Sequence, residues 1–221
     1  MNFRAMRTRI ILADDHELVR KSIAALLRDE PDFEVVAECS NGRELLDLVA
    51  RVKPSVALID VAMPELNGVE ATRRIRELSP MTRVIVLSNY ADATYVRETL
   101  KAGAVGYIVK SGAAQDLIEA VRTGTRSHIY LSDAVSAIAI AAKEPVTRGS
   151  SDGGTRPLSA REREVLQLIA EGRTSKEVAS LLGISATTVK SHRNHIMEKL
   201  DIHDKAGLTR YAIRIGLIRI E

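Results

Sequence analysis

The chain has 221 residues, of which 45% are hydrophobic and 28% are charged, and its formal net charge is +3 at pH 7. This length suits one large or two small domains, and the composition excludes a disordered, collagen-like or coiled-coil chain. The longest nearly apolar stretch, residues 134–142, is about half of the ~20 residues that a membrane span needs, so we expect no membrane protein.

The N-terminus and the cysteine content bear on the cellular compartment. The sequence MNFRAMRTR is basic but has neither the apolar core nor the small-residue cleavage site of a secretory signal. Cys39 is the single cysteine, so it can form no disulfide within the chain and no cysteine cluster for zinc or iron–sulfur. It is most simply a small apolar residue. We therefore expect a protein of the reducing cytoplasm.

The excess positive charge lies near the C-terminus. Residues 1–156 contain 21 Lys and Arg against 21 Asp and Glu, whereas residues 157–221 contain 11 against 8. Charge alone does not distinguish a surface that binds nucleic acid from a solvated C-terminal region.

The N-terminal part alternates short β-branched runs with longer amphipathic runs. Short runs that are apolar on successive residues are typical of parallel strands covered by helices on both faces. The predicted strands are residues 10–13, 35–37, 56–59, 84–87 and 105–109, and the helical patterns cover residues 18–27, 44–52, 68–78, 94–102 and 114–121. Five βα units predict a doubly wound, five-stranded parallel α/β sheet over residues 1–127.

A linker is predicted over residues 128–156. Ser132 and Asp133 can cap a short helix over about residues 132–143, and the sequence PVTRGSSDGGTRP that follows is rich in Pro, Gly and Ser. We interpret this segment as a tether between two domains.

An all-α domain of four helices is predicted over residues 157–221. Ser159 with Glu162, and Thr174 with Glu177, have the spacing of capping boxes, and each pair precedes a helical apolar pattern. The predicted helices cover residues 159–171, 175–182, 186–200 and 204–215.

Polar side chains follow the predicted strands at the edge where parallel sheets bind ligands, beyond the carboxyl ends of the strands. These residues are Asp14 and Asp15 after the first strand, Asp60 after the third, Ser88 after the fourth and Lys110 after the fifth. Three carboxylates that crowd together repel one another, and a hard cation with oxygen ligands relieves this repulsion. Mg²⁺ suits such a site because it takes one or two carboxylates together with phosphate oxygens.

This set of groups can perform phosphoryl transfer. A carboxylate beside Mg²⁺ can attack phosphorus and form an aspartyl phosphate. Lys110 would counter the remaining charge, and the Ser88 hydroxyl could donate a hydrogen bond to a phosphoryl oxygen. A single Asp at a strand end is more often a helix cap, but five residues at these positions favour a phosphoryl-transfer site.

The motifs ILADDH, ALIDVAMPELNG, VIVLSNY and KAGAVGYIVK resemble the receiver domain of bacterial two-component response regulators over about residues 7–125. The resemblance implies a flavodoxin-like fold in which Asp60 accepts the phosphoryl group with Mg²⁺ as cofactor. It also implies that Asp14 and Asp15 form the acidic metal pocket. Asp15, Asp60 and the backbone carbonyl of Ala62 would be the metal ligands.

The same resemblance assigns roles to residues of the later strands. Ser88 and Lys110 would contact the phosphoryl group. Tyr107 matches the aromatic switch position, whose ring turns inward when the serine hydroxyl is drawn toward the phosphate; taken alone, it is a half-buried strand aromatic. Ala62 and Asn89 flank the line along which water would attack, and they leave the lifetime of the phosphate open.

His16 follows the acidic pair, and a role as metal ligand is the less favoured alternative. We expect it at the rim of the site, at the start of the first helix, because Mg²⁺ prefers oxygen ligands.

The segment SKEVASLLGISATTVKSHRNHIMEKL has helix-turn-helix spacing. One helix reaches Leu182, Gly183 permits a sharp turn, and a second helix begins near Ser185. The apolar residues of the second helix that should pack inward are Val189, Ile196 and Leu200. Its other face can donate hydrogen bonds to base edges, since Lys or Arg addresses guanine and Asn addresses adenine. An ordinary polar helix surface is the alternative.

Residues 158–218, from LSAREREVL to LTRYAIRIGLI, resemble the DNA-binding domain of the LuxR/FixJ/NarL type. The resemblance implies a four-helix domain with a recognition helix at about residues 186–200. It implies base contacts from Lys190, Ser191 and Asn194, and phosphate contacts from Thr188, Arg193 and Lys199. The last helix resembles the dimerisation helix of this family, with packing inside the domain as the alternative.

Together, the two resemblances predict a transcription regulator and not an enzyme. A histidine kinase or a small phosphodonor would phosphorylate Asp60, and the chains would then pair as homodimers that bind double-stranded DNA. Two alternatives stay open: a phosphorylation-independent regulator whose receiver is an interaction module, and an Mg²⁺-dependent phosphohydrolase with an aspartyl nucleophile.

Overall fold

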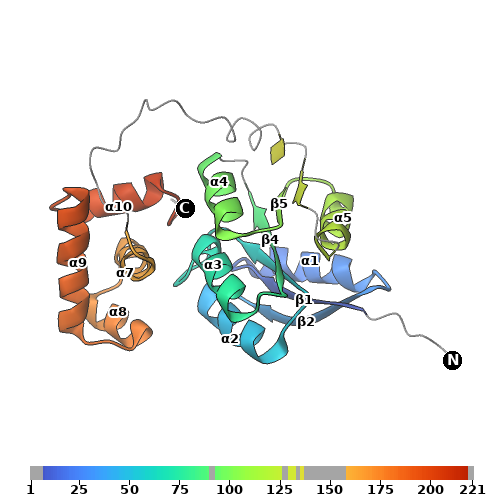
Figure 1. Cartoon of the computed structure of the whole chain (residues 1–221), viewed down its shortest axis with the longest axis horizontal. Helices are drawn as coiled ribbons and strands as arrows, with labels where there is room; N and C mark the ends of the chain where they lie inside the picture. The colour runs from blue at the N-terminus through green and yellow to red at the C-terminus, as the bar shows by residue number, and fades with distance from the viewer. Residues whose placement is uncertain (1–6, 90–92, 126–128, 133–134, 137–157, 219–221) are drawn as a thin grey trace. The chain divides into compact units, whose positions relative to one another are not determined.

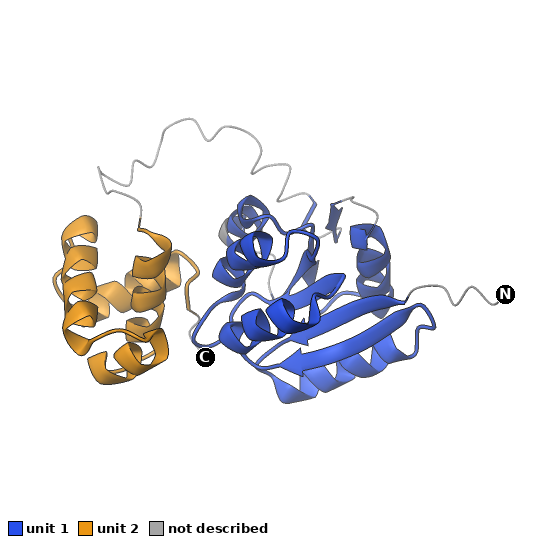
Figure 2. Cartoon of the chain, turned by 60° about the horizontal axis from the view of Figure 1, so that its bottom comes forward, with its two compact units in different colours: residues 1–144 blue, residues 145–221 orange. Residues whose placement is uncertain are grey.

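The computed structural model describes residues 7–89, 93–125, 129–132, 135–136 and 158–218. The chain divides into two compact units, residues 1–144 and residues 145–221, which Figure 2 colours separately. The boundary falls inside the predicted linker. Of the short helix expected there, Val135 and Ser136 are helical, whereas residues 133–134 and 137–143 lie outside the described part of the chain.

Unit 1 is built on a parallel sheet with the strand order β2-β1-β3-β4-β5-β6. In chain order its elements are β1 (Thr8–Ala13), α1 (Glu17–Arg28), β2 (Phe33–Cys39), α2 (Gly42–Val52), β3 (Val56–Asp60), α3 (Gly68–Leu78), β4 (Arg83–Ser88), α4 (Ala93–Ala102), β5 (Gly106–Val109), α5 (Ala114–Thr125) and β6 (Tyr130–Leu131). The five predicted βα units are all present. The strand order reverses between β1 and β3, which is the place where such sheets bind ligands.

The sequence predicts five strands, and the structure adds β6 at the outer edge of β5. The Tyr130 N–H donates to the Val105 carbonyl at 2.9 Å, and the Ser132 N–H donates to the Tyr107 carbonyl at 3.2 Å. Two residues are too short a run to produce a hydrophobic period, so the sequence pattern does not indicate this strand.

Helices cover both faces of the sheet, as Figure 1 shows. Successive residues of a strand point to opposite faces. Within β1, Ile10 and Leu12 pack in one core with residues of α1 and α5, whereas Ile11 and Ala13 pack in the other core with residues of α2, α3 and α4. The continuous apolar runs in the sequence therefore reflect burial on both sides of the sheet.

Cys39 lies at the end of β2 with 4% of its surface exposed. Burial raises the pKa of its thiol to about 12. The thiol therefore stays protonated, in agreement with its interpretation as a small apolar residue.

The loop between β3 and α3 lies close against two glycines. A Cβ atom on Gly68, the first residue of α3, would stand 2.3 Å from the carbonyl oxygen of Asp60. A Cβ atom on Gly42, the first residue of α2, would stand 2.1 Å from the carbonyl oxygen of Leu66. Both helices can begin this close to the loop only because these two residues lack a side chain. The main chain at Asp60 and in the loop after it is therefore closely packed against the starts of α3 and α2.

Unit 2 is all helical and has its own hydrophobic core. Its elements are α7 (Ala160–Ala170), α8 (Ser175–Leu182), α9 (Ala186–Leu200) and α10 (Lys205–Arg214), which match the four predicted helices. Both predicted capping boxes form, Ser159 with Glu162 at α7 and Thr174 with Glu177 at α8. Gly183 ends α8 with φ of 63°, in the left-handed region that glycine adopts readily.

No helix in the described parts of either unit is long and apolar enough to cross a membrane.

Replacing Gly68 with Ala should destabilise unit 1, because the added methyl group collides with the main chain at Asp60 and not with a flexible side chain. We expect the free energy of unfolding to fall by about 1–3 kcal/mol, measured by urea denaturation. Gly124→Ala in α5 is the matched control, since its Cβ atom would meet side-chain atoms and no main chain, with Cδ1 of Ile85 at 3.1 Å and Cγ2 of Val105 at 3.5 Å. Equal stability of the Gly68→Ala variant and the wild type would contradict the close approach.

Candidate functional site

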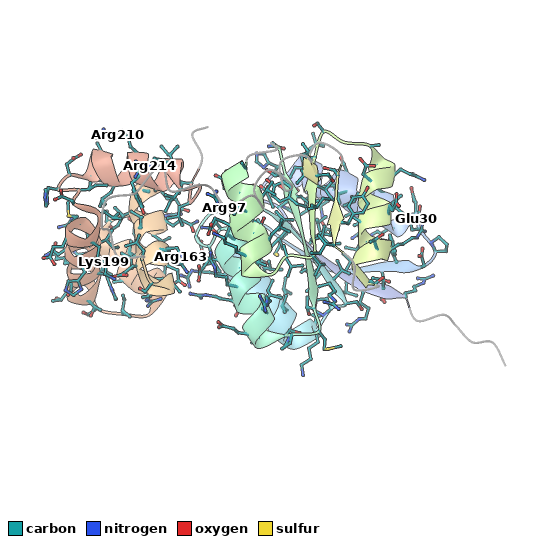
Figure 3. All side chains as sticks on the ribbon, turned by 45° about the horizontal axis from the view of Figure 1, so that its top comes forward. Glu30, Arg97, Arg163, Lys199, Arg210 and Arg214 are labelled. Carbon is teal, nitrogen blue, oxygen red and sulfur yellow. The ribbon has the colours of Figure 1, made fainter. Side chains whose placement is uncertain are left out.

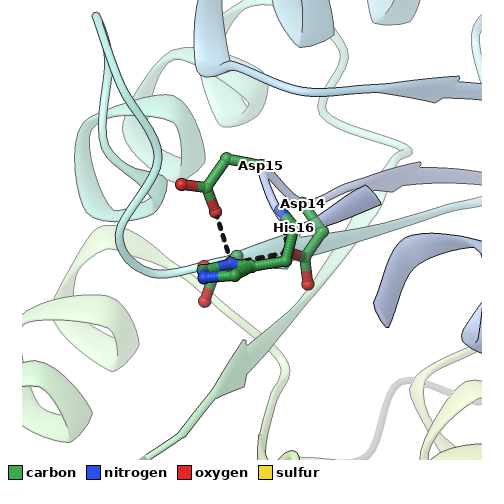
Figure 4. A group of neighbouring side chains, drawn as sticks. Asp14, Asp15 and His16 are labelled. Carbon is green, nitrogen blue, oxygen red and sulfur yellow. Dashed lines mark hydrogen bonds and ion pairs between the residues drawn. The ribbon is translucent and has the colours of Figure 1, made fainter. Parts of the chain in front are cut away.

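Carboxylates from two strands meet at the carboxyl edge of the sheet in unit 1. Asp14 follows β1 and Asp60 ends β3, and both residues are fully buried. Asp15 and His16 come next in the chain after Asp14, and one ligand atom from each of these four residues lies within 4.8 Å of the others. Figure 4 shows Asp14, Asp15 and His16 around this point. The structure thus brings together the three acidic residues predicted from the strand ends.

Lys110 brings a positive charge to the same point. Its Nζ atom lies 2.6 Å from Oδ2 of Asp14 and 3.3 Å from Oδ1 of Asp60, and 7% of its side chain is exposed. Lys110 directly follows β5, which is separated from β3 by β4 alone. The sheet order therefore allows one ammonium group to reach two carboxylates at once.

The charge of this group suits a divalent cation. Three carboxylates and one ammonium group leave a net charge of −2 when His16 is neutral, which one Mg²⁺ ion would balance. Carboxylate oxygens are also the ligands that Mg²⁺ prefers. The residues present therefore fit a magnesium site.

His16 lies at the rim, at the N-cap position of α1, with 54% of its side chain exposed. Its Nδ1 atom is 2.9 Å from Oδ1 of Asp15 and 3.4 Å from Oδ1 of Asp14, as the dashed lines in Figure 4 show. Its backbone N–H also donates to Oδ1 of Asp14 at 2.9 Å. The imidazole thus contacts the carboxylates that a cation would use.

Ser88 and Tyr107 lie on the two strands beside β3. Ser88 ends β4 with 1% of its surface exposed, and its carbonyl accepts a hydrogen bond from the Lys110 N–H at 2.6 Å. The Tyr107 side chain is fully buried among the core residues on the α2, α3 and α4 side of the sheet. It is therefore more deeply buried than a strand aromatic taken alone suggests, because helices cover this face. Asn89 is exposed and Ala62 is half-buried.

Arg20 of α1 supports the acidic loop from the side. Its guanidinium donates to the backbone carbonyl of Asp14 at 2.5 Å and lies 3.7 Å from Glu38 on β2. Arg28 and Lys21 also contact Glu38, and although burial alone would raise the pKa of Glu38, their hydrogen bonds hold it below its ordinary value. The sequence gives no signal for this role of Arg20, since one cation on a helix face does not indicate which main-chain carbonyl it will reach.

The second candidate site is the exposed face of α9 in unit 2. The helix begins at Ser185, whose side chain accepts a hydrogen bond from the Thr188 N–H at 3.0 Å. As predicted, the buried residues of α9 are Val189, Ile196 and Leu200. The helical period places Ser191 and Asn194 opposite this buried face. The predicted contact residues that are exposed are Thr188, Lys190, Ser191, Arg193 and Asn194.

Lys199 of α9 differs from the other predicted contacts because its charge is already paired inside the unit. Its Nζ atom lies 2.7 Å from Oε2 of Glu162, and 30% of its side chain is exposed. Figure 3 labels Lys199 on α9. The same carboxylate oxygen accepts the Ser159 N–H at 2.8 Å in the capping box of α7. A phosphate contact from Lys199 would compete with this pair.

Two protein families match the chain, one in each unit. The "Response regulator receiver domain" matches residues 10–122, and "Bacterial regulatory proteins, luxR family" matches residues 156–212. The first match contains all five strand-end residues predicted above, and the second contains the helix-turn-helix segment.

Several known proteins are similar to the chain over nearly its whole length. The transcriptional regulatory protein LiaR of Bacillus subtilis (strain 168) is 37% identical over 213 residues, which cover 95% of this chain and 99% of LiaR. The transcriptional regulatory protein DegU of Brevibacillus brevis is 34% identical over 227 residues, which cover 97% and 96% of the two chains. A solved structure of the two-component response regulator RcsB in complex with DNA has a TM-score of 0.58 and 26% identity, and the match covers 93% of this chain and 97% of RcsB.

The Glu162→Gln substitution should destabilise unit 2 in a pH-dependent way. Burial alone would raise the pKa of Glu162, but bonds from Lys199 and Ser159 lower it to about 2. The ionised carboxylate therefore contributes stability above about pH 4.5, and this contribution is lost as the pH falls from about 4.5 toward 2. At pH 7 we expect the variant to lose about 1–3 kcal/mol of unfolding free energy.

Urea denaturation of the wild type and the variant at several pH values measures this difference. The gap between the two proteins should narrow as the pH falls below about 4.5. Glu198→Gln, on the exposed face of α9, is the control and should change stability little. A gap of constant size down to pH 3 would contradict the role of the ionised Glu162.

Proposed function

The chain belongs to the bacterial response regulators that join a receiver domain to a LuxR-type DNA-binding domain, and from this premise we propose that phosphorylation of Asp60 controls its binding to DNA. The main support is the buried cluster of Asp14, Asp60 and Lys110 at the carboxyl ends of parallel strands. The relatives named above are transcriptional regulators and not enzymes. The phosphohydrolase alternative therefore has no support.

Asp14, Asp15 and Asp60, together with the backbone carbonyl of Ala62, would hold Mg²⁺. When bound, the ion would offset the carboxylate charge and draw charge from the oxygens of a transferring phosphoryl group. The support for this assignment is the close approach of the three carboxylates and their net charge of −2 after pairing with Lys110.

A phosphohistidine of a cognate histidine kinase, or a small phosphodonor, would supply the phosphoryl group. A carboxylate oxygen of Asp60 would attack phosphorus, and the bond from phosphorus to the donor would break with its electron pair leaving on the donor. Lys110, already 3.3 Å from Asp60, would hold negative charge on the phosphoryl oxygens. The Ser88 hydroxyl would donate a hydrogen bond to one of these oxygens.

Tyr107 would transmit the change away from Asp60. Tyr107 belongs to β5 and precedes Lys110 by three residues. Its partner in the sheet is Val86 of β4, which precedes Ser88 by two residues. A shift of Ser88 toward the phosphoryl group would favour one packing of the buried Tyr107 ring over another. A phosphorylated chain would then populate a state that pairs as a homodimer, because the phosphoryl group contacts that state more favourably.

The α9 helix of each chain would enter a major groove of double-stranded DNA. Lys190 can address guanine and Asn194 can address adenine, with Ser191 beside them. Thr188 and Arg193 would contact phosphates, and Lys199 would reach a phosphate only by leaving Glu162. A regulator that binds chromosomal DNA would act in the cytoplasm.

The Asp60→Asn substitution should abolish labelling of the chain by a radioactive acyl phosphate in the presence of Mg²⁺, because the amide cannot act as the nucleophile. Asp47→Asn, on the exposed face of α2, is the control and should be labelled like the wild type. Light scattering of the same samples should show dimers for the wild type and the Asp47→Asn variant and monomers for the Asp60→Asn variant. Labelling of the Asp60→Asn variant at another residue would contradict the assignment of the acceptor.

DNA binding provides a separate test. Equal affinity for DNA of the wild type with and without acyl phosphate treatment would favour the phosphorylation-independent alternative.

The Lys190→Ala substitution should weaken binding to a duplex selected by the wild type from a random library. We expect a loss of about 1–3 kcal/mol together with relaxed preference at one base position, measured by fluorescence anisotropy. Arg210→Ala, which removes an equal charge from the exposed side of α10, should leave base preference unchanged (Figure 3). Unchanged base preference of the Lys190→Ala variant would exclude this residue from base reading.

A further inference from the structure

A cavity of about 330 Å³ opens in unit 2 beside the recognition helix. It lies where the segment before α8, the middle of α9 and the start of α10 come together. The polar residues that line it include Arg173, Ser175, Arg193, Asp204 and Lys205, and Met197 forms part of its apolar floor. Of these residues, Arg193 alone is a DNA contact predicted from the sequence.

The side chains around this cavity favour an anion. Arg173, Arg193 and Lys205 are all exposed and come from three different segments, so they surround the opening with three positive charges. Asp204 is the one acidic residue of the lining, and its carboxylate accepts the Gly207 N–H at 2.8 Å as the N-cap of α10. His203 also lines the cavity, and its ring lies 3.2 Å from Asp201. The net charge of the lining is +2 with His203 neutral.

Two helices begin at the cavity and add to its positive potential. Ser175 is the first residue of α8 and Lys205 is the first residue of α10. The third N–H of each helix is taken by its cap, Thr174 or Asp204, whereas the first two have no acceptor within the helix. The helix dipole is positive at this end. The polar groups and the cations therefore favour the same kind of ligand, an oxygen-rich anion.

The cavity also adjoins the face of α9 that would read bases. Lys190, Arg193 and Met197 follow one another at spacings of three and four residues, so they lie along one flank of the helix. Arg193 and Met197 line the cavity, and Lys190 lies one turn before Arg193. A helix in the major groove has a sugar–phosphate backbone on each side. The cavity is therefore placed where one of these backbones would pass.

The opposite flank of α9 offers less positive charge. Thr188 and Lys199 lie on that side, and the Lys199 ammonium is paired with Glu162 at 2.7 Å. The flank beside the cavity carries the cations that remain available for DNA.

We propose that this cavity binds a backbone phosphate of duplex DNA next to the base pairs that α9 reads, with Arg173 and Lys205 as the contacts. This inference rests on the proposed function of unit 2 in DNA binding. It adds a phosphate site formed by three segments of the unit and independent of base sequence.

The test uses the full chain and a 30-base-pair duplex of arbitrary sequence, with affinity measured by fluorescence anisotropy between roughly 50 and 300 mM salt. Arg173→Gln and Lys205→Gln should each lower the affinity about 3–10-fold at low salt. Each should also reduce the slope of log affinity against log salt by about 0.9, as expected for one lost phosphate contact. Circular dichroism verifies that the variants keep their helices.

Arg210→Gln is the matched control, because it removes the same charge from α10 without lining the cavity. It should leave the salt slope unchanged. Slopes of the Arg173→Gln and Lys205→Gln variants equal to that of the wild type would overturn the phosphate site. An equal decrease in all three variants would also overturn it, since overall charge would then explain the effect.

A second measurement separates DNA phosphate from free phosphate. Calorimetric titration of the wild type with inorganic phosphate should show no saturable binding below millimolar concentration. Tight binding of inorganic phosphate that the Arg173→Gln variant lacks would assign the cavity to a free anion and overturn the proposal. A wild type that fails to bind any duplex would overturn the proposed DNA-binding function as well, so the two failures are distinguishable.

Discussion

The ion pairs of Lys110 with Asp14 and Asp60 allow unit 1 to bury two carboxylates at the edge of its sheet. Two carboxylates without solvent exposure would be very unfavourable if they lacked a positive partner, because the interior of a protein solvates charge poorly. One ammonium group neutralises part of this charge and leaves a negative remainder. That remainder is the charge that a divalent cation would balance in the proposed phosphorylation site. The ion pairs therefore offset part of the cost of burying the two carboxylates, and the same charges form the candidate site.

Main-chain hydrogen bonds connect the strands beside this cluster, from β4 through β5 to the segment after β6. The carbonyl of Ser88 accepts the N–H of Lys110, and the carbonyl of Tyr107 accepts the N–H of Ser132 just beyond β6. The strand β5 thus lies between the acidic site and the last described part of unit 1. On the other side of the site, Asp60 and the loop after it are closely packed against Gly68 and Gly42.

Residue type alone does not decide the role of a basic side chain in unit 2. Lys199 and Lys190 belong to the same helix, yet Lys199 pairs with the capping carboxylate of α7 and Lys190 is exposed. Arg173 and Lys205 are far apart in sequence, yet both line the cavity beside α9. The start of α8 also lies at this cavity, because its N-cap residue Thr174 is part of the lining. Packing inside the unit therefore selects which cations remain available for a ligand.

The order of the βα units, the four C-terminal helices and the residues at the strand ends could all be predicted from the amino-acid sequence, because hydrophobic period, capping boxes and strand-end position are local properties. Other features depend on how the elements pack. The pairing of Lys199 with Glu162 joins residues 37 positions apart, β6 forms through main-chain bonds that any short segment can make, and Arg20 reaches Asp14 only once α1 has packed. Such contacts depend on distances between elements, and a periodic pattern along one chain carries no information about those distances.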